Sequence, residues 1–110
     1  MSQEVVAVAE QIKKLIEAIR IEGARSNVLV LAKAEAMRLY DKAIAVKELK
    51  LKSEGMAIGL INHQAKGDAS QLMCEMIVAQ ESLKAHWQRL AYLLAQLNGW
   101  QSIYRHLTHT

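Results

Sequence analysis

Residues 69–107 read ASQLMCEMIVAQESLKAHWQRLAYLLAQLNGWQSIYRHL, and this stretch decides the fold of the chain. Large apolar residues return at every third or fourth position, which is the spacing that places side chains on one face of an α-helix. The pattern predicts one long amphipathic helix over about 70–106, whose apolar side the rest of the chain should cover. The apolar positions are Leu72, Met76, Ala79, Leu83, Trp87, Leu90, Leu94, Leu97, Tyr104 and Leu107.

One turn-like dipeptide, Asn98-Gly99, lies in the path of this helix. The apolar register nevertheless passes from Leu97 to Tyr104 without slipping, and two helices joined by a turn would have no reason to keep one phase. We therefore expect a continuous helix with at most a bend near Gly99.

The composition also favours helices. The 110 residues contain no Pro and no Phe, and only 5% are aromatic. Proline is excluded from helix interiors, whereas strands favour aromatic and β-branched residues. Because 52% of the residues are hydrophobic and 23% are charged, the chain has an ordinary globular composition. We expect a single helical domain over 1–110.

Residues 2–22 predict the first helix, with Ser2 as its N-cap. A break follows at Gly23, where a turn or only a kink would fit, and we expect a turn. The helix carries one heptad-like apolar stripe, made of Val5, Val8, Ile12, Leu15 and Ile19.

Residues 27–54 predict the second helix, which carries two apolar stripes. The stripe rich in alanine would let a partner helix approach closely. Gly55 should end this helix, a short helix should follow over 57–65, Gly67 should end that one, and Asp68 or Ser70 should cap the last helix. The alanine-rich stripe is Ala32, Ala36, Leu39, Ala43 and Val46, and the other is Val30, Met37, Tyr40, Ile44 and Leu51.

These elements predict an all-α fold: a long antiparallel helical hairpin, similar to a coiled coil, with the N-terminal helix added alongside to form a helical bundle. The apolar stripes are wider than one helix pair can cover. We therefore expect a homo-oligomer, most simply a homodimer.

The net charge of +3 is mild, and its excess lies in residues 26–54. The basic side chains there point all round the helix with acidic residues among them, which favours a solvated, salt-bridged surface over a phosphate-binding one. The single cysteine, Cys74, excludes an intrachain disulfide and fits a reducing compartment; we expect it to be buried beside the apolar stripe. Since there is no signal peptide and no membrane-length apolar run, we expect a cytoplasmic protein without a membrane partner.

The sequence offers little for catalysis, cofactors or metals. It shows no nucleophile and base pairing and no phosphate-binding loop. His106 and His109 have a chelating i,i+3 spacing, but no carboxylate or thiol is placed to complete a metal site. We expect no metal, no cofactor and no enzyme activity, and a small enzyme would require a deep pocket where His86 or His106 faces a carboxylate.

Six residues are candidates for contacting a partner. His63, Gln64 and Lys66 form the best exposed polar cluster, near the tip of the predicted hairpin. Trp100, Tyr104 and Arg105 lie near the end of the long helix. Aromatic residues there could stack on bases, but we expect core or interface anchors.

The run from Tyr40 to Arg105 resembles a group of small helical proteins encoded in the early regions of phages and prophages of Gram-positive bacteria. The shared features are LKSEGM at 51–56, Leu60-Ile61, AKGD at 65–68, and a long helix closing with QSIYR at 101–105. The first 25 residues and Asn98-Gly99 depart from that pattern.

The resemblance implies a context, since such genes lie among phage recombination and single-strand-binding genes. Together with the mild basic excess and the missing catalytic motifs, it leads us to expect a non-enzymatic accessory protein of the host-cell cytoplasm that acts in phage DNA recombination or replication, through a phage or host protein or on DNA directly. The alternative is a counter-defence inhibitor of the anti-CRISPR type that blocks a host defence complex.

Overall fold

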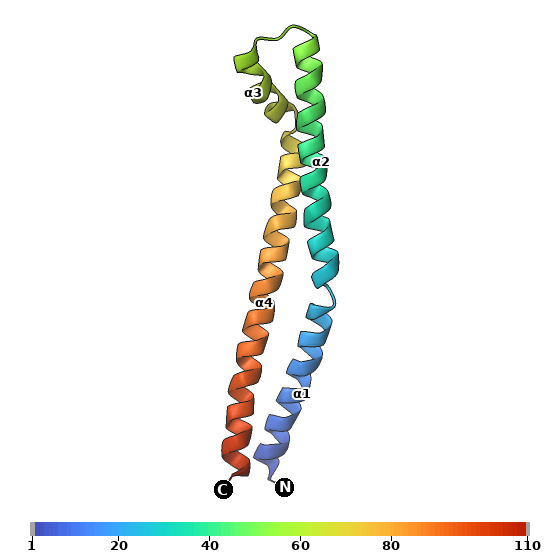
Figure 1. Cartoon of the computed structure of the whole chain (residues 1–110). Coiled ribbons are helices and arrows are strands. Elements are labelled where there is room, and N and C mark those ends of the chain that lie inside the picture. Colours follow the sequence, from blue (N-terminus) through green and yellow to red (C-terminus); the bar gives the residue numbers. More distant parts are fainter. Residues whose placement is uncertain (1, 110) are drawn as a thin grey trace. The chain divides into compact units, whose positions relative to one another are not determined.

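The computed structural model describes residues 2–109 and consists of helices joined by short connections (Figure 1). In order they are α1 (Gln3–Gly23), α2 (Ser26–Ser53), α3 (Ile58–Asp68) and α4 (Ser70–Thr108). No β-strand occurs between residues 2 and 109. The all-α fold predicted from the composition and the apolar spacing is confirmed.

Helix α4 runs through Asn98-Gly99 without interruption over 39 residues. The predicted continuity is confirmed, because the backbone at Gly99 keeps a negative φ and the helical register passes through it. A Cβ at Gly99 would meet nothing within 4 Å.

Local sequence signals set two of the helix ends. At the start of α1, the Ser2 hydroxyl accepts a hydrogen bond from the Val5 backbone N–H at 3.2 Å, so Ser2 is the N-cap as predicted. At the end of α2, Gly55 has a φ of 82°, a conformation that L side chains rarely adopt. The Gly55 N–H donates to the Lys52 carbonyl and the Met56 N–H to the Leu51 carbonyl, which is a Schellman motif.

One of two glycine-based predictions about the connections is wrong, and the other is confirmed. Gly67 lies inside α3, and the prediction that it ends the helix is wrong, because the Ala69 N–H still donates to the Ala65 carbonyl in the helical pattern. At Gly23 the interruption covers only Ala24 and Arg25. Ala24 keeps right-handed helical angles and its N–H donates to the Arg20 carbonyl. The break is therefore a two-residue turn, as predicted.

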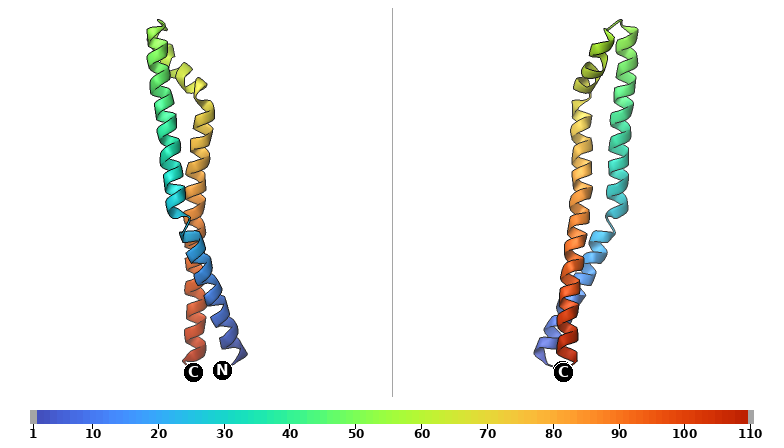
Figure 2. Two further views of the ribbon diagram at one scale, coloured as in Figure 1. Left: turned by 90° about the vertical axis from the view of Figure 1, so that its right-hand side faces the viewer. Right: turned by 60° about the vertical axis from the view of Figure 1, so that its left-hand side comes forward.

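The chain divides into two compact units, and α4 contributes residues to both. Unit 1 joins residues up to 27 with residues from 84 onward, and unit 2 consists of residues 28–83. In unit 1, α1 lies beside the second half of α4 in both views of Figure 2. In unit 2, α2 lies along the first part of α4, with α3 packed near the end of α2 (Figure 1). Each unit therefore pairs one long helix with one part of α4.

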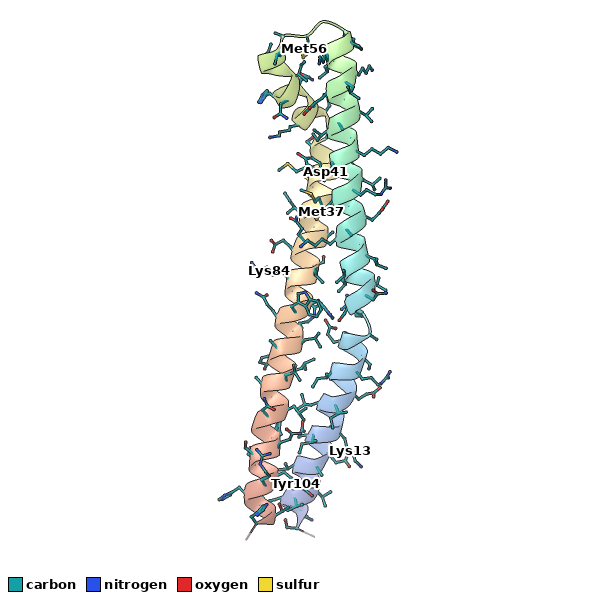
Figure 3. The ribbon with its side chains drawn as sticks, viewed as in Figure 1. Lys13, Met37, Asp41, Met56, Lys84 and Tyr104 are labelled. Atoms are coloured by element: carbon teal, nitrogen blue, oxygen red, sulfur yellow. The ribbon has the colours of Figure 1, made fainter. Side chains whose placement is uncertain are left out.

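Both units have small cores. In unit 1 the buried residues of α1 are Val5, Val8 and Leu15, all members of the predicted stripe. In unit 2, Leu51, Ile61 and Ala65 form a cluster against which Ile44 and Met56 pack; Figure 3 shows Met56 at the connection between α2 and α3. Among the described residues, none of the helices combines the length and hydropathy that a membrane crossing needs.

Candidate functional site

The first three predicted contact residues lie on α3. His63, Gln64 and Lys66 are all exposed on a helix, because Ile61 and Ala65 of the same helix turn into the core. The Gln64 amide donates a 3.0 Å hydrogen bond to the Asp68 carboxylate one turn later. The α3 surface therefore presents an imidazole and an ammonium to solvent.

An ion pair holds the end of α3 to α2. The Lys47 ammonium lies 3.2 Å from the Asp68 carboxylate. The hydrogen bonds from Lys47 and then Gln64 hold the pKa of Asp68 below its usual value. The pair borders a shallow hollow of about 360 Å³ lined by Ala43, Val46, Lys47, Lys50, Ala65, Asp68, Ala69 and Leu72.

A second hollow lies between α2 and the start of α3. It measures about 520 Å³ and includes Leu49 and Ile58, which are 70% and 85% exposed. The Asn62 amide donates a 2.9 Å hydrogen bond to Glu48 across it. This part of unit 2 leaves large aliphatic side chains in water.

The other three predicted contact residues, Trp100, Tyr104 and Arg105, belong to unit 1. Trp100 and Tyr104 are half-buried, and Tyr104 lies where α4 runs beside α1 (Figure 3). Arg105 is exposed and donates a 3.2 Å hydrogen bond to the Ser102 hydroxyl. The six candidate residues thus fall into two sets of three, one in each compact unit.

The predicted apolar stripe of α4 is wrong by one residue near the middle of the helix. The side chain of His86 is completely buried, whereas Trp87, which was assigned to the apolar stripe, is 47% exposed. Both positions fit the spacing between Leu83 and Leu90, because a helix accepts steps of three or four. The prediction of a buried Cys74 is also wrong, since that thiol is exposed.

His86 is the centre of a polar cluster that the sequence analysis did not detect. Its Nδ1 lies 3.0 Å from the Glu22 carboxylate at the end of α1, and its Nε2 lies 2.7 Å from the Ser26 hydroxyl at the start of α2. The Arg89 guanidinium, one turn along α4, donates to the same Glu22 oxygen at 2.7 Å. Arg25 forms a further ion pair with Glu22 at 3.2 Å.

The hydrogen bonds keep Glu22 ionised and place a proton on Nδ1 of His86. The pKa of Glu22 is lowered from 4.5 to about 2 because Arg89, then His86, and then Arg25 hydrogen-bond to the carboxylate, against an opposing effect of burial. A carboxylate can only accept, so Nδ1 of His86 carries the proton that faces it. In the neutral imidazole, Nε2 then accepts from the Ser26 hydroxyl. Every polar atom of the buried ring therefore has a partner.

The order serine, histidine, carboxylate is also that of nucleophilic hydrolases. Here the imidazole is enclosed, and the hollow that borders the cluster is lined by Ala18, Ile21, Glu22, Arg89, Tyr92 and Leu93 rather than by Ser26 or His86. We interpret the cluster as a polar connection that joins the end of α1 and the start of α2 to α4.

The described part of the chain, residues 2–109, holds no group of three or more His, Cys, Asp or Glu side chains placed to bind a metal ion. Comparison of the chain with protein-family models, with curated proteins and with solved structures gives no match.

Proposed function

We propose that this protein is a non-enzymatic phage accessory protein that works by binding, in phage DNA recombination or replication within the host-cell cytoplasm. Two lines support the proposal. One is the resemblance of residues 40–105 to small early-region phage proteins. The other is the amount of apolar surface that the folded chain leaves exposed.

The exposed apolar surface is the observation that carries the proposal. Among residues 2–109, nineteen large hydrophobic side chains are exposed, against eight hydrophobic residues that are buried. Isolated exposed hydrophobic residues are common, but extensive apolar faces on a small protein mark sites of association. A monomer that has no binding partner would be expected to bury more of these side chains. We therefore infer that partners, including a second copy of the chain, cover the exposed apolar faces of the helices.

The charge of the two units suggests where DNA would bind if it is a partner. Unit 1 contains seven Lys and Arg against four Asp and Glu, while unit 2 contains seven of each. The basic excess of residues 26–54 is offset by the acidic excess of residues 55–83, so unit 2 is neutral and the net charge of +3 belongs to unit 1; residues 82–110 contain no acidic residue. Within unit 1, however, the Arg89 guanidinium already forms an ion pair with Glu22 and is not free to bind a phosphate. Since the remaining basic excess is small, we favour a protein partner over direct binding of DNA.

The test is retention of partners from phage-infected host cells on the tagged full chain, followed by mass spectrometry. Enrichment of a phage recombinase or single-strand-binding protein would support the proposal. Enrichment of a host defence complex would replace it with the counter-defence alternative. If the exposed α3 surface contacts the partner, Lys66→Glu should lower the amount of partner that is retained. Lys84→Glu, the same charge reversal in unit 1, should then leave that amount unchanged.

The DNA branch has its own measurement. Binding of single- and double-stranded DNA should weaken steeply as salt is added, because each phosphate contact releases a counterion. Binding that is absent or insensitive to salt would remove DNA as a direct partner while leaving the protein partner open.

A further inference from the structure

The side of α2 that faces solvent carries a stripe of large aliphatic residues. Five residues of this one helix are between 38% and 70% exposed: Val28, Leu31, Leu39, Val46 and Leu49. At 100° per residue they fall within an arc of roughly 80°. Leu51 is the one buried residue of α2, and it lies on the other side of the helix. We call these five residues the outer stripe.

Two charged residues interrupt the outer stripe near its middle. Glu35 and Lys42 lie within the same arc, four residues before Leu39 and three residues after it. The Glu35 carboxylate is held by Arg38 of its own helix through bonds of 2.9 and 2.6 Å. The Lys42 ammonium makes no ion pair with any residue between 2 and 109. The stripe therefore has opposite charges placed on either side of a central leucine.

This arrangement matches itself when it is turned end to end. A twofold axis near Leu39 would bring Glu35 opposite Lys42 of a second copy and, by symmetry, Lys42 opposite Glu35 of that copy. The same axis pairs Leu31 with Val46 and Val28 with Leu49, because each of these pairs, like Glu35 and Lys42, is placed symmetrically about the point between Arg38 and Leu39. One twofold axis therefore serves all three pairs, and it lies about half of the 1.5 Å helical rise from Leu39.

We propose that the outer stripe of α2 is the surface on which a second copy of this chain docks, as an antiparallel pair of α2 helices related by a twofold axis near Leu39. This proposal names the face used in the self-association that forms part of the proposed function. The aliphatic side chains of the stripe expose roughly 450 Å² in each copy if a full side chain offers about 150 Å². Complete burial of this surface in both copies would remove about 900 Å² from water, just below the ~1,000 Å² that a specific interface should exceed, so residues that flank the stripe must contribute as well.

The first experiment measures the mass of the full chain by sedimentation equilibrium, with far-UV circular dichroism to confirm helicity. The measured mass of the wild-type protein should equal that of two chains. Val46→Glu should give monomers of unchanged helicity, because it places a carboxylate in the apolar contact, while Val78→Glu on the exposed side of α4 should remain dimeric. A dimeric Val46→Glu variant would overturn the assignment of this face.

Charge reversal tests the twofold register. Glu35→Lys and Lys42→Glu should each weaken the dimer roughly tenfold or more, because each places like charges opposite each other at two symmetric positions. The double variant, Glu35→Lys with Lys42→Glu, should restore the dimer to within about threefold of wild type. Failure of the double variant to recover would overturn the antiparallel pairing.

These outcomes separate the inference from the proposed function. A wild-type monomer would remove self-association and with it this inference, while the retained phage or host partner would still be judged by the infected-cell experiment. A wild-type dimer that is indifferent to every change in the outer stripe would overturn the inference alone.

Discussion

Replacing His86 with alanine tests whether the buried polar cluster holds unit 1 together. The imidazole is completely buried and makes hydrogen bonds to Glu22 and Ser26. Each bond contributes about 1 kcal/mol, and a lost ring of roughly 70 Å³ costs about 1.7 kcal/mol at 24 cal/mol per Å³ of cavity. The variant should lose about 3–4 kcal/mol of unfolding free energy. Glu22 would keep its contacts with Arg89 and Arg25, so no isolated charge is left behind.

The assay is urea unfolding followed by circular dichroism and by tryptophan fluorescence. The fluorescence is informative because the Trp87 ring centroid lies 4.9 Å from that of His86. With a urea slope of roughly 1.5 kcal/mol per molar, the midpoint of unfolding should fall by about 2–2.7 M. His106→Ala is the matched control, because the same residue type is exposed on the same helix, and it should change stability by less than about 0.5 kcal/mol. Equal losses from the two variants would refute a structural role for the cluster.

Two further predictions concern acid stability and the glycines. Because the pKa of Glu22 falls from 4.5 to about 2 on folding, the stability that its ionised form contributes is complete above pH 4.5 and is lost as the pH falls towards 2. Urea midpoints over this range should decline less for Glu22→Gln than for wild type or for Glu4→Gln, and an unchanged acid slope would contradict the assignment. Gly55→Ala should cost about 1 kcal/mol or more, because Gly55 has a φ of 82°. Gly99→Ala should instead stabilise the folded chain by about 0.5–1 kcal/mol in thermal or urea unfolding, because Gly99 is helical and nothing lies within 4 Å of its Cβ position. A loss of stability in Gly99→Ala would show that another chain approaches this glycine closely.

Local physics made several elements predictable. Ser2 could be assigned as an N-cap because a hydroxyl before the first turn satisfies a helix N–H by itself. The end of α2 at Gly55 followed from the rarity of a left-handed conformation in other residues. The continuity of α4 followed from an apolar phase that does not change across Asn98-Gly99. Each of these features depends on residues within a few positions of one another.

Contacts between segments far apart in the chain could not be predicted from the sequence. Glu22 and His86 are 64 residues apart, and nothing in either neighbourhood states that the two side chains will meet. The choice between His86 and Trp87 as the buried position needed the partner helix, because helical spacing permits both. Gly67 stayed within α3 for a similar reason: Ala69 beyond it is buried and its N–H bonds to the Ala65 carbonyl, which favours continuing the helix past a residue that is otherwise a weak helix former.

The sequence by itself determined that the chain is helical, where most of its helices begin and end, and that its apolar faces exceed what the chain can cover. The tertiary structure decided which face of each helix is buried, that α4 serves two compact units, and that a histidine takes a core position with every polar atom satisfied. The physical reason is the distance along the chain over which each interaction acts. Capping, glycine conformation and periodicity act over one or two turns, whereas burial is settled only when segments far apart in the sequence remove each other's surfaces from water.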